Sequence, residues 1–323
     1  MKRVFKCVSA IAGVLLLSVI TSAAAPAMAE KCDVGPVFEF TRGAAEGLAV
    51  APNGDIVVGN INTGEIWLAP RGDFARATLF ADLIDEEHPF RFVLGMDITP
   101  DGTLFVAVNA FFDPALHGLW RIDRSGTATL AAPFPPLFQS LLNDVAIDRR
   151  GNVYVSDSLG GAVWKMTPEG ELAMWSDGAI WEGGEHPIFG IPFGVNGLTY
   201  HQGALYGGIY LEGRIVRVPI AHDGTAGTPE DLVVDAALIG ADGLEVDASG
   251  DLYVAVNDAD TLVRIDSKDL TIETLIWGLS APASIVVTPN RQTVYIANLS
   301  ISAPAPRPYE AAVMAATLCQ SRP

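Results

Sequence analysis

The sequence predicts an all-β protein, a six-bladed β-propeller whose blades are four-stranded antiparallel sheets. Three observations carry this prediction. One segment recurs six times, each copy contains two short strands around a tight turn, and no helix of useful length precedes the C-terminus. Successive copies begin 48, 49, 53, 46 and 41 residues apart. This period is typical of propeller blades, whereas solenoids seldom build each repeat from four antiparallel strands.

The first element of each repeat is a hairpin, in which apolar residues alternate on both sides of a turn. The copies are EGLAVAPNGDIVVGN from Glu46, LGMDITPDGTLFVAVN from Leu94, NDVAIDRRGNVYVSD from Asn143, NGLTYHQGALYGGIY from Asn196, DGLEVDASGDLYVAVN from Asp242 and ASIVVTPNRQTVYIAN from Ala283. A third strand follows in forms such as GEIWL and TLVRID, and a weaker fourth strand follows it, as in RATLFADL. Four strands per repeat and six repeats therefore account for the chain.

The sixth repeat lacks an evident fourth strand after its predicted third strand, residues 309–318. The spare N-terminal segment VFEFT, residues 37–41, could supply it. We therefore expect the two ends of the chain to meet in one blade and to close the ring.

The N-terminus has the form of a secretory signal. MKRVFK supplies positive charge, VSAIAGVLLLSVI is a short apolar run, and Ala27-Met28-Ala29 offers a small-residue cleavage site. The apolar run is too short for a comfortable membrane span. The sequence thus predicts a signal over residues 1–29, a single propeller domain over residues 30–323, a secreted or periplasmic location and no membrane association after cleavage.

Charge and cysteine content narrow the possible partners. The chain has a formal net charge of −18, and loss of three basic residues with the signal leaves 17 basic against 38 acidic side chains, a balance of −21. No basic stripe is present, which argues against a nucleic-acid partner.

Cys32 and Cys319 remain near the two ends of the mature chain, and in an oxidising compartment we expect them to form a disulfide.

The residue at the head of each repeat is the candidate for chemistry. Aligned by their hairpin turns, these six residues are Glu46, Leu94, Asn143, Asn196, Asp242 and Ala283. The first strand of a propeller blade is innermost, so their side chains should converge on the central channel. Four of them carry side-chain oxygen and two are carboxylates, a set that suits a hard divalent cation, calcium first. The alternative is that polar side chains merely line a wet channel.

At these segments the sequence resembles the regucalcin/gluconolactonase (senescence-marker-protein-like) family of six-bladed propellers. AEGLAV, LNDVAID, VNGLTY and ADGLEV look like that family's signature segments, in order and over nearly the whole mature chain. The resemblance implies a divalent cation held by Glu46, Asn196 and Asp242, with Asn143 completing the shell or contacting substrate. It also implies Asp242 as general base and a lactone-hydrolysing activity; related propellers hydrolyse organophosphates.

One departure from that family concerns the substrate. Sugar-lactonase members carry an arginine two residues before the asparagine that corresponds to Asn143, and here the position is Leu141. The loops that enter the first strands are rich in apolar residues, which predicts an apolar pocket at the channel mouth. Their phenylalanines are Phe90, Phe92, Phe134, Phe138, Phe189 and Phe193. Two loop histidines, His88 and His186, are candidates for proton transfer, and His186 also for substrate contact; the alternative is that each is a solvated loop side chain.

The second strands end in a recurrent polar residue. These residues are Asn60, Asn109, Asp157, Asn257 and Asn298. We expect them to fix the following turns through their side chains, with a substrate role as the lesser alternative.

Together these observations predict a secreted, metal-dependent hydrolase of lactones or related esters that acts on a small-molecule substrate, apolar rather than a sugar. A phosphotriesterase on the same scaffold and a non-catalytic binding propeller remain as alternatives, because fold alone does not fix function. The sequence leaves the oligomeric state open.

Overall fold

The structure, a computed structural model, describes residues 33–83, 91–110, 113–135, 139–187, 190–288, 292–300 and 311–318. The predicted signal segment, His88, and both Cys32 and Cys319 lie outside these ranges. Residues Lys31–Pro323 form one compact unit. No helix in the described ranges is long and apolar enough to cross a membrane.

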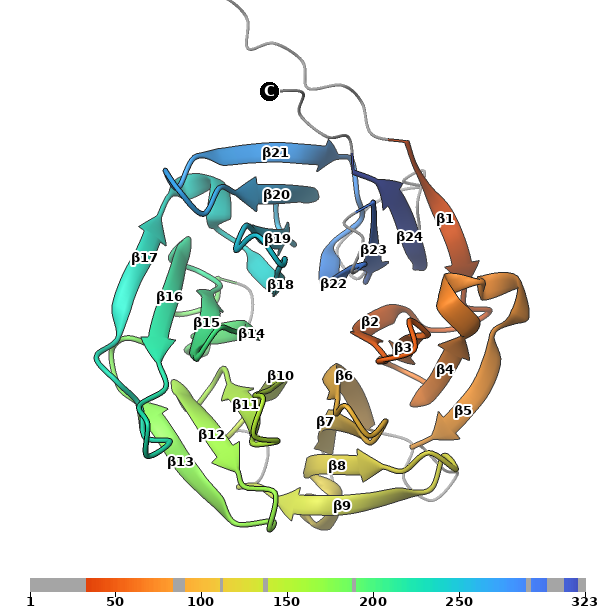
Figure 1. Cartoon of the computed structure of the whole chain (residues 1–323), viewed down its shortest axis with the longest axis horizontal. Coiled ribbons are helices and arrows are strands. Elements are labelled where there is room, and N and C mark those ends of the chain that lie inside the picture. The colour runs from red at the N-terminus through yellow and green to blue at the C-terminus, as the bar shows by residue number, and fades with distance from the viewer. Residues whose placement is uncertain are drawn as a thin grey trace, which may run out of the picture. The chain divides into compact units, whose positions relative to one another are not determined.

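Six four-stranded antiparallel sheets are arranged in a ring (Figure 1), which confirms the predicted six-bladed propeller. The strands of the first three blades are β2 (Ala45–Val50), β3 (Ile56–Asn60), β4 (Glu65–Ala69) and β5 (Thr78–Asp82); β6 (Arg91–Ile98), β7 (Leu104–Ala110), β8 (Gly118–Ile122) and β9 (Ala128–Pro133); and β10 (Leu142–Ile147), β11 (Val153–Asp157), β12 (Ala162–Met166) and β13 (Leu172–Asp177). In each blade the first strand is innermost and the fourth is outermost.

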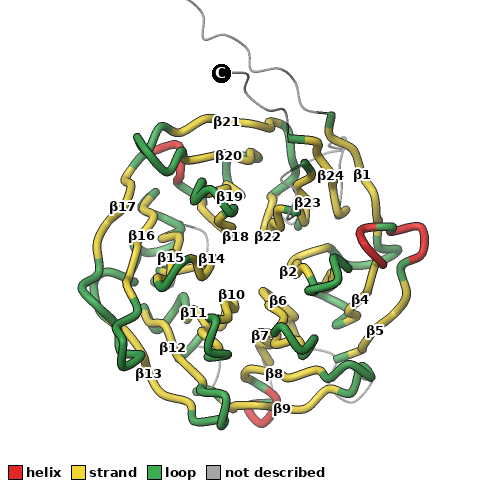
Figure 2. The backbone as a smooth tube through the Cα atoms, viewed as in Figure 1, coloured by secondary structure: helices red, strands yellow, loops and turns green. Residues whose placement is uncertain are grey.

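The other three blades repeat this order. Their strands are β14 (Val195–His201), β15 (Ala204–Ile209), β16 (Arg214–Pro219) and β17 (Glu230–Val234); β18 (Ala241–Val246), β19 (Leu252–Val256), β20 (Thr261–Ile265) and β21 (Ile272–Trp277); and β22 (Pro282–Val287), β23 (Thr293–Asn298), β24 (Ala312–Thr317) and β1 (Val34–Glu39). Loops and four short 3-10 helices connect the strands that the structure describes (Figure 2).

The ring closes through the N-terminal strand. Strand β1 pairs antiparallel with β24, from Val34 opposite Ala316 to Glu39 opposite Ala312, and so becomes the outermost strand of the sixth blade. This confirms the predicted closure, although the strand begins three residues earlier than VFEFT and ends two residues earlier. The chain ends thereby stabilise each other, since neither strand has another neighbour on that side.

The hydrophobic core lies between adjacent blades rather than inside one sandwich. Each of six clusters of buried residues joins two neighbouring sheets, as when Val57 and Ile66 of the first blade pack with Leu104 and Val106 of the second. The interior faces of β-branched and leucine-rich strands supply these contacts, and burial of each such side chain contributes about 1.5–3 kcal/mol. The core therefore fixes the six inner strands side by side around the channel.

Candidate metal and active site

In every blade the pairing of the first strand with the second is interrupted at the head residue, the first residue of each sequence repeat. The register of pairing between first and second strands shifts between Ala45 and Leu48 in the first blade, and between Val195 and Leu198 in the fourth. The same irregularity occurs in the other four blades. A bulge releases residues from the ladder and re-aims their side chains. Asn196-Gly197 is therefore a bulge in β14, not a hairpin turn, and the turn of that blade follows at Gln202-Gly203.

Glycines after the head residues bring the inner strands close together. A Cβ atom added at Gly47, Gly197 or Gly243 would collide with the carbonyl oxygen of the next blade's head residue, which is Leu94, Asp242 or Ala283 respectively. Where the glycine is replaced, a side chain bonds across the gap: Asp144 Oδ2 accepts from the N–H of Leu198 at 2.8 Å, and Ser284 Oγ accepts from the N–H of Leu48 at 3.2 Å. The six head residues therefore form one tight ring around the channel.

The four oxygen-bearing head residues are all buried. Glu46, Asn143, Asn196 and Asp242 are 6%, 6%, 3% and 8% exposed. The Oε2 atom of Glu46 and the Oδ1 atom of Asn196 have no hydrogen-bond partner, although both are buried. A buried acceptor without a partner costs free energy comparable to the loss of a hydrogen bond or more. Two such atoms in one ring fit a cation that coordinates them.

The electrostatics of the ring also favour a bound cation. Burial, followed by the charges of Asp242 and Asp144, raises the pKa of Glu46 well above its ordinary value. Burial and the charge of Asp144 likewise raise the pKa of Asp242, while a hydrogen bond from Asn257 opposes the rise. Carboxylates forced together in this way repel each other unless protons or a cation compensate the charge. A divalent cation would compensate two charges at once.

The composition of the site is that of a hard-cation site. Nowhere in the described ranges do three or more His, Cys, Asp or Glu side chains come together as a metal cluster. The ring instead offers two carboxylates and two amides, all oxygen donors, from β2, β10, β14 and β18. Calcium accepts carboxylate and amide oxygens together, and its flexible geometry suits ligands from four separate strands.

Two of the candidate ligands are held by side chains that the sequence did not assign to the site. The Nδ2 atom of Asn143 donates to Ser158 Oγ at 3.2 Å, so that the amide oxygen is left for another partner. The Nδ2 atom of Asn257 donates to Asp242 Oδ2 at 3.0 Å. Asn257 was expected to fix a turn, and this expectation was wrong: its amide bonds Asp242 and the carbonyl of Pro282 instead.

The turn-fixing role is confirmed for Asn60 and Asp157 but was wrong for Asn109, whose side chain bonds the C=O and N–H groups of Leu142 in the next blade. The Oδ1 atom of Asn60 accepts from the N–H groups of Asn62 and Thr63, and Asp157 Oδ1 accepts from the N–H groups of Leu141 and Gly160. The sequence pattern that marks these positions does not distinguish a side chain that turns back on its own loop from one that reaches the neighbouring strand.

His186 lies in an aromatic group at the same end of the ring. Its ring centroid is 5.7 Å from that of Phe193 and 6.2 Å from that of Tyr210, and Phe193 packs edge-on against Tyr210 at 5.3 Å. The Tyr210 hydroxyl reaches Asp258 Oδ1 at 2.9 Å and Asn257 Oδ1 at 3.3 Å. Because Asn257 also contacts Asp242, Tyr210 links this aromatic group to the candidate base.

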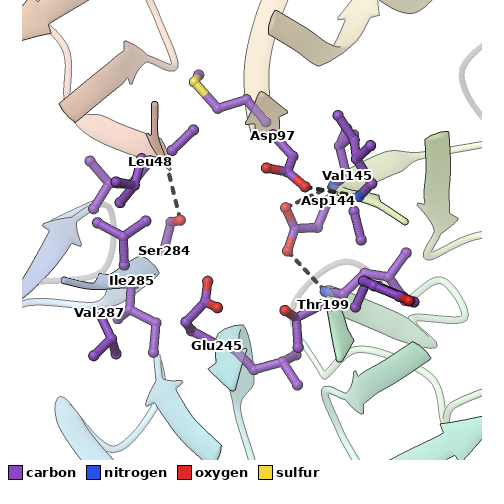
Figure 3. A pocket seen from close by; sticks show the side chains of 18 of the residues that line it. Leu48, Asp97, Asp144, Val145, Thr199, Glu245, Ser284, Ile285 and Val287 are labelled. Carbon is purple, nitrogen blue, oxygen red and sulfur yellow. Dashed lines mark hydrogen bonds between the residues drawn. The ribbon is translucent and has the colours of Figure 1, made fainter. Parts of the chain in front are cut away.

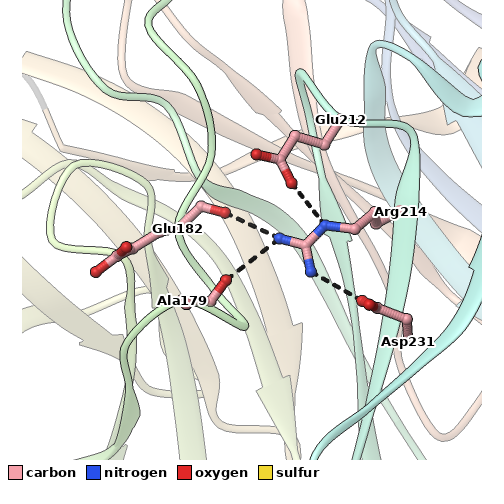
Figure 4. Close-up of polar contacts among 5 residues, drawn as sticks. All are labelled: Ala179, Glu182, Glu212, Arg214 and Asp231. Carbon is pink, nitrogen blue, oxygen red and sulfur yellow. Dashed lines mark hydrogen bonds and ion pairs between the residues drawn. The ribbon is translucent and has the colours of Figure 1, made fainter.

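The loop that carries His186 and Phe193 is held at its base. Arg214 bridges Glu212 at 2.7 Å and Asp231 at 2.8 Å, and its Nη2 atom donates to the carbonyls of Ala179 and Glu182 (Figure 4). The buried Trp181 receives a backbone hydrogen bond from Val195 at 2.9 Å. These contacts fix the base of the loop between the third and fourth blades.

The predicted phenylalanine-rich mouth is only partly present. Phe134 is 6% exposed and packs edge-on against Trp164, so it belongs to the core between the second and third blades. Phe92 lies in β6 and packs against the same cluster. Phe134 was wrongly expected at the mouth because its ring is buried in that core, and Phe92 belongs to a strand rather than to a loop. Phe90, Phe138 and Phe189 lie outside the described residues, which leaves Phe193 as the described member of the set beside the site.

The other half of the channel is an acidic cavity of about 350 Å³. The carboxyl groups of Asp97, Asp144 and Glu245 face this cavity together with Ser284 (Figure 3), and none of its lining residues is basic. Burial is the main cause that raises the pKa values of Asp97 and Asp144 to about 7 and that of Glu245 to about 8. Asp97 also links blades, since its Oδ2 atom accepts from the N–H of Ile147 at 2.8 Å.

Solved structures share this architecture. No protein-family model and no curated protein matches the sequence. Regucalcin from Agrobacterium tumefaciens, a calcium-binding protein, superposes with a TM-score of 0.67 at 16% identity over 89% of this chain and 94% of that one. A gluconolactonase from Xanthomonas campestris gives 0.63 at 16% identity, over 89% and 90%.

The likeness extends to enzymes of other chemistry. Virginiamycin B lyase from Staphylococcus aureus superposes with a TM-score of 0.58 at 14% identity, over 90% of this chain and 100% of that one. At these identities the comparisons show the six-bladed fold alone, so the function must be argued from the ring of side chains.

Proposed function

We propose that this protein is a metal-dependent hydrolase of lactones or related esters, with calcium as its cation. The observation that carries the proposal is the pair of buried, unpartnered oxygens, Glu46 Oε2 and Asn196 Oδ1, in a ring that also holds Asp242. Glu46, Asn196 and Asp242 would hold the cation, and Asn143 would add its amide oxygen. A bound cation of this kind polarises a carbonyl oxygen and stabilises the charge that develops on it.

Asp242 is the residue to which we assign proton transfer. One of its oxygens, Oδ2, accepts the hydrogen bond from Asn257, which leaves Oδ1 for the channel. An ionised carboxylate at this point would take a proton from a water molecule as that water attacks the ester carbonyl. The proton would then pass to the leaving alkoxide, so that the products are a hydroxy acid, or an acid and an alcohol.

The non-reacting part of the substrate would lie against the aromatic group formed by His186, Phe193 and Tyr210. Leu141, which stands where sugar lactonases carry arginine, offers no hydrogen bond from its side chain to a sugar hydroxyl. Each unpaired hydroxyl buried in a pocket is penalised, whereas each buried CH₂ contributes about 0.8 kcal/mol. An apolar lactone or an aryl ester is therefore the substrate class that we propose.

The experiment is a hydrolysis screen of the purified protein, stripped of metal with EDTA and then supplied with calcium. The panel contains gluconolactone, long-chain γ- and δ-lactones, aryl esters and phosphotriesters. We expect hydrolysis of lactones or aryl esters that requires calcium and that is lost in Asp242→Ala. Turnover of phosphotriesters alone would favour the second enzymatic reading, and no turnover of any substrate would favour a binding protein.

A further inference from the structure

The position just beyond the second strand carries a polar side chain in three successive blades. Counted seven residues from the hairpin glycines Gly151, Gly203 and Gly250, these positions are Ser158, Tyr210 and Asn257. They follow directly after β11, β15 and β19. Because the blades are related by rotation about the channel, these three side chains form an arc outside the ring of head residues.

Two members of this arc form a hydrogen bond with the candidate ligand of their own blade. Asn143 donates to Ser158, and Asn257 donates to Asp242, and the two residues of each pair are 15 positions apart. Asn143 bonds the arc through Nδ2 and Asp242 bonds it through Oδ2, so that Oδ1 of each ligand is left for the channel. An identical spacing in two blades indicates a shared arrangement rather than an isolated contact.

The arc residues also form hydrogen bonds with neighbouring blades. Ser158 Oγ donates to the carbonyl of Val195 at 2.7 Å, the residue before Asn196, so it links the ligands of the third and fourth blades. Tyr210 approaches both Asn257 and Asp258 from the fourth blade and so links the fourth and fifth. Ser158 is 1% exposed and Tyr210 is 7% exposed, so water competes little for these bonds.

We infer that Ser158, Tyr210 and Asn257 are positioning residues, which set the orientation of Asn143 and Asp242 toward the bound cation. The inference rests on the proposed metal site, and it assigns to that site an outer set of side chains. Outer-shell hydrogen bonds fix the direction in which a ligand presents its oxygen, and their loss typically costs 10–100-fold in metal affinity or activity. At the matching position the first blade has Ile61. The second blade has the buried Asn109, whose side chain bonds the C=O and N–H groups of Leu142 and no candidate ligand.

The chain supplies a matched control. In the third blade Asn152 Nδ2 donates to Asp148 Oδ2 at 2.7 Å. This is an amide–carboxylate contact like that between Asn257 and Asp242, although it is more deeply buried. This pair lies at the β10–β11 hairpin, away from the head residues. Asn152→Ala therefore removes an equivalent hydrogen bond without touching the arc.

The test is calorimetric titration of calcium chloride into the EDTA-stripped full-length protein, at a temperature where each variant is folded by circular dichroism. We expect Asn257→Ala and Ser158→Ala to weaken calcium binding by about 10–100-fold. Tyr210→Phe should weaken it less than Asn257→Ala does, because Tyr210 acts through Asn257. Asn152→Ala should bind calcium within about twofold of wild type, since it leaves the arc intact.

Calcium binding by both Asn257→Ala and Ser158→Ala at wild-type affinity would overturn the inference and leave the metal site standing. Equal weakening in Asn152→Ala would also overturn it, because the effect would then be one of general stability. If Asn257→Ala does not fold, Ser158→Ala and Tyr210→Phe, which each remove a single oxygen, decide the question. Failure of the wild type to bind calcium would overturn the inference and the proposed metal site together, whatever esters the protein hydrolyses.

Discussion

The carbonyl oxygen of Asp242 occupies the space that a Cβ atom on Gly197 would need. This close approach of β14 and β18 places two candidate ligands, Asn196 and Asp242, on adjacent strands of the ring. We predict that Gly197→Ala lowers the free energy of unfolding by about 1–3 kcal/mol, as overpacking does in other well-packed sites, and weakens calcium binding.

The control for this variant is Gly35→Ala in β1. A Cβ atom at Gly35 would meet nothing within 4 Å, and its φ angle is not in the left-handed region. Urea denaturation with and without calcium compares the two variants. Equal stability of Gly197→Ala and Gly35→Ala would contradict the tight ring.

A disulfide between Cys32 and Cys319 remains a prediction, since both cysteines lie outside the described residues. The N–H of Thr317 donates to the carbonyl of Asp33 at 3.1 Å, in the blade where the chain ends meet. Closure of so long a loop contributes roughly 4–5 kcal/mol in the chain-entropy model. Non-reducing peptide mapping should find a peptide that links the two cysteines, and a thermal melt with reductant should show a lower Tm. Two free thiols in protein prepared under oxidising conditions would refute the disulfide.

The acidic cavity predicts an unusual pH dependence of stability in EDTA. Burial and the charge of Asp97 raise the pKa of Glu245 to about 8, so between about pH 4.5 and pH 8 the folded protein holds a proton that the unfolded chain has released. Stability then falls as the pH rises through this window. Glu245→Gln cannot lose that proton, and it should be little changed at pH 5 but more stable than wild type by at least about 1 kcal/mol at pH 8.

Glu273→Gln serves as the comparison for Glu245→Gln. Glu273 is on the outer strand β21, where it pairs with Arg264 at 3.2 Å and its side chain is 38% exposed. Its replacement should shift stability by a similar small amount at both pH values. Stability curves of wild type and Glu245→Gln that run parallel from pH 5 to pH 8 would rule out the proposed proton uptake.

Burial of His117 predicts that stability changes with pH in the opposite direction at lower pH. It is fully buried, its Nδ1 atom accepts from the N–H of Ala110 at 3.2 Å, and its Nε2 atom is 3.0 Å from Ser140 Oγ. Burial lowers the pKa of His117 to about 4. Between about pH 6.5 and pH 4 the unfolded chain therefore binds a proton that the folded protein does not, and stability is lost as the pH falls through this window.

His117→Gln removes that proton-binding group. The variant should be less stable than wild type at pH 7, but the difference in Tm between variant and wild type should shrink toward pH 4.5. Differential scanning calorimetry across this range measures it. A constant difference would show that the ring of His117 does not resist protonation.

The hydrogen bonds of His117 also define its role. Because Nδ1 accepts a hydrogen bond, the neutral ring carries its proton on Nε2 and donates it to Ser140 Oγ. His117 is therefore not the base of a serine nucleophile.

The aromatic group beside Asp242 predicts a kinetic effect. Phe193→Ala should raise KM for an aryl ester several-fold and leave kcat for a small lactone nearly unchanged, because the ring contacts only the non-reacting part of the substrate. Met174→Ala, at a half-exposed position on the outer strand β13, is the control. An equal loss of kcat on both substrates in Phe193→Ala would place the ring in the reaction itself.

The repeats made the fold predictable, because alternation and glycine turns recur in six copies and each copy reinforces the others. The same alignment predicted that Glu46, Asn143, Asn196 and Asp242 lie together, since equivalent strand positions in a propeller converge. It did not identify the partners of Asn143 and Asp242. Tertiary contacts decide whether the side chain of Asn257 hydrogen-bonds its own turn or the neighbouring carboxylate of Asp242. Phe134 shows the same limit, because an apolar loop residue turns toward the core or the mouth according to the packing around it.

The most direct test of the central claim is anomalous diffraction from crystals of this protein grown with calcium or manganese. We predict an anomalous peak in the ring, within about 2.6 Å of Glu46 Oε2, Asn196 Oδ1 and an oxygen of Asp242. Ring oxygens with no anomalous peak among them at saturating metal would contradict it.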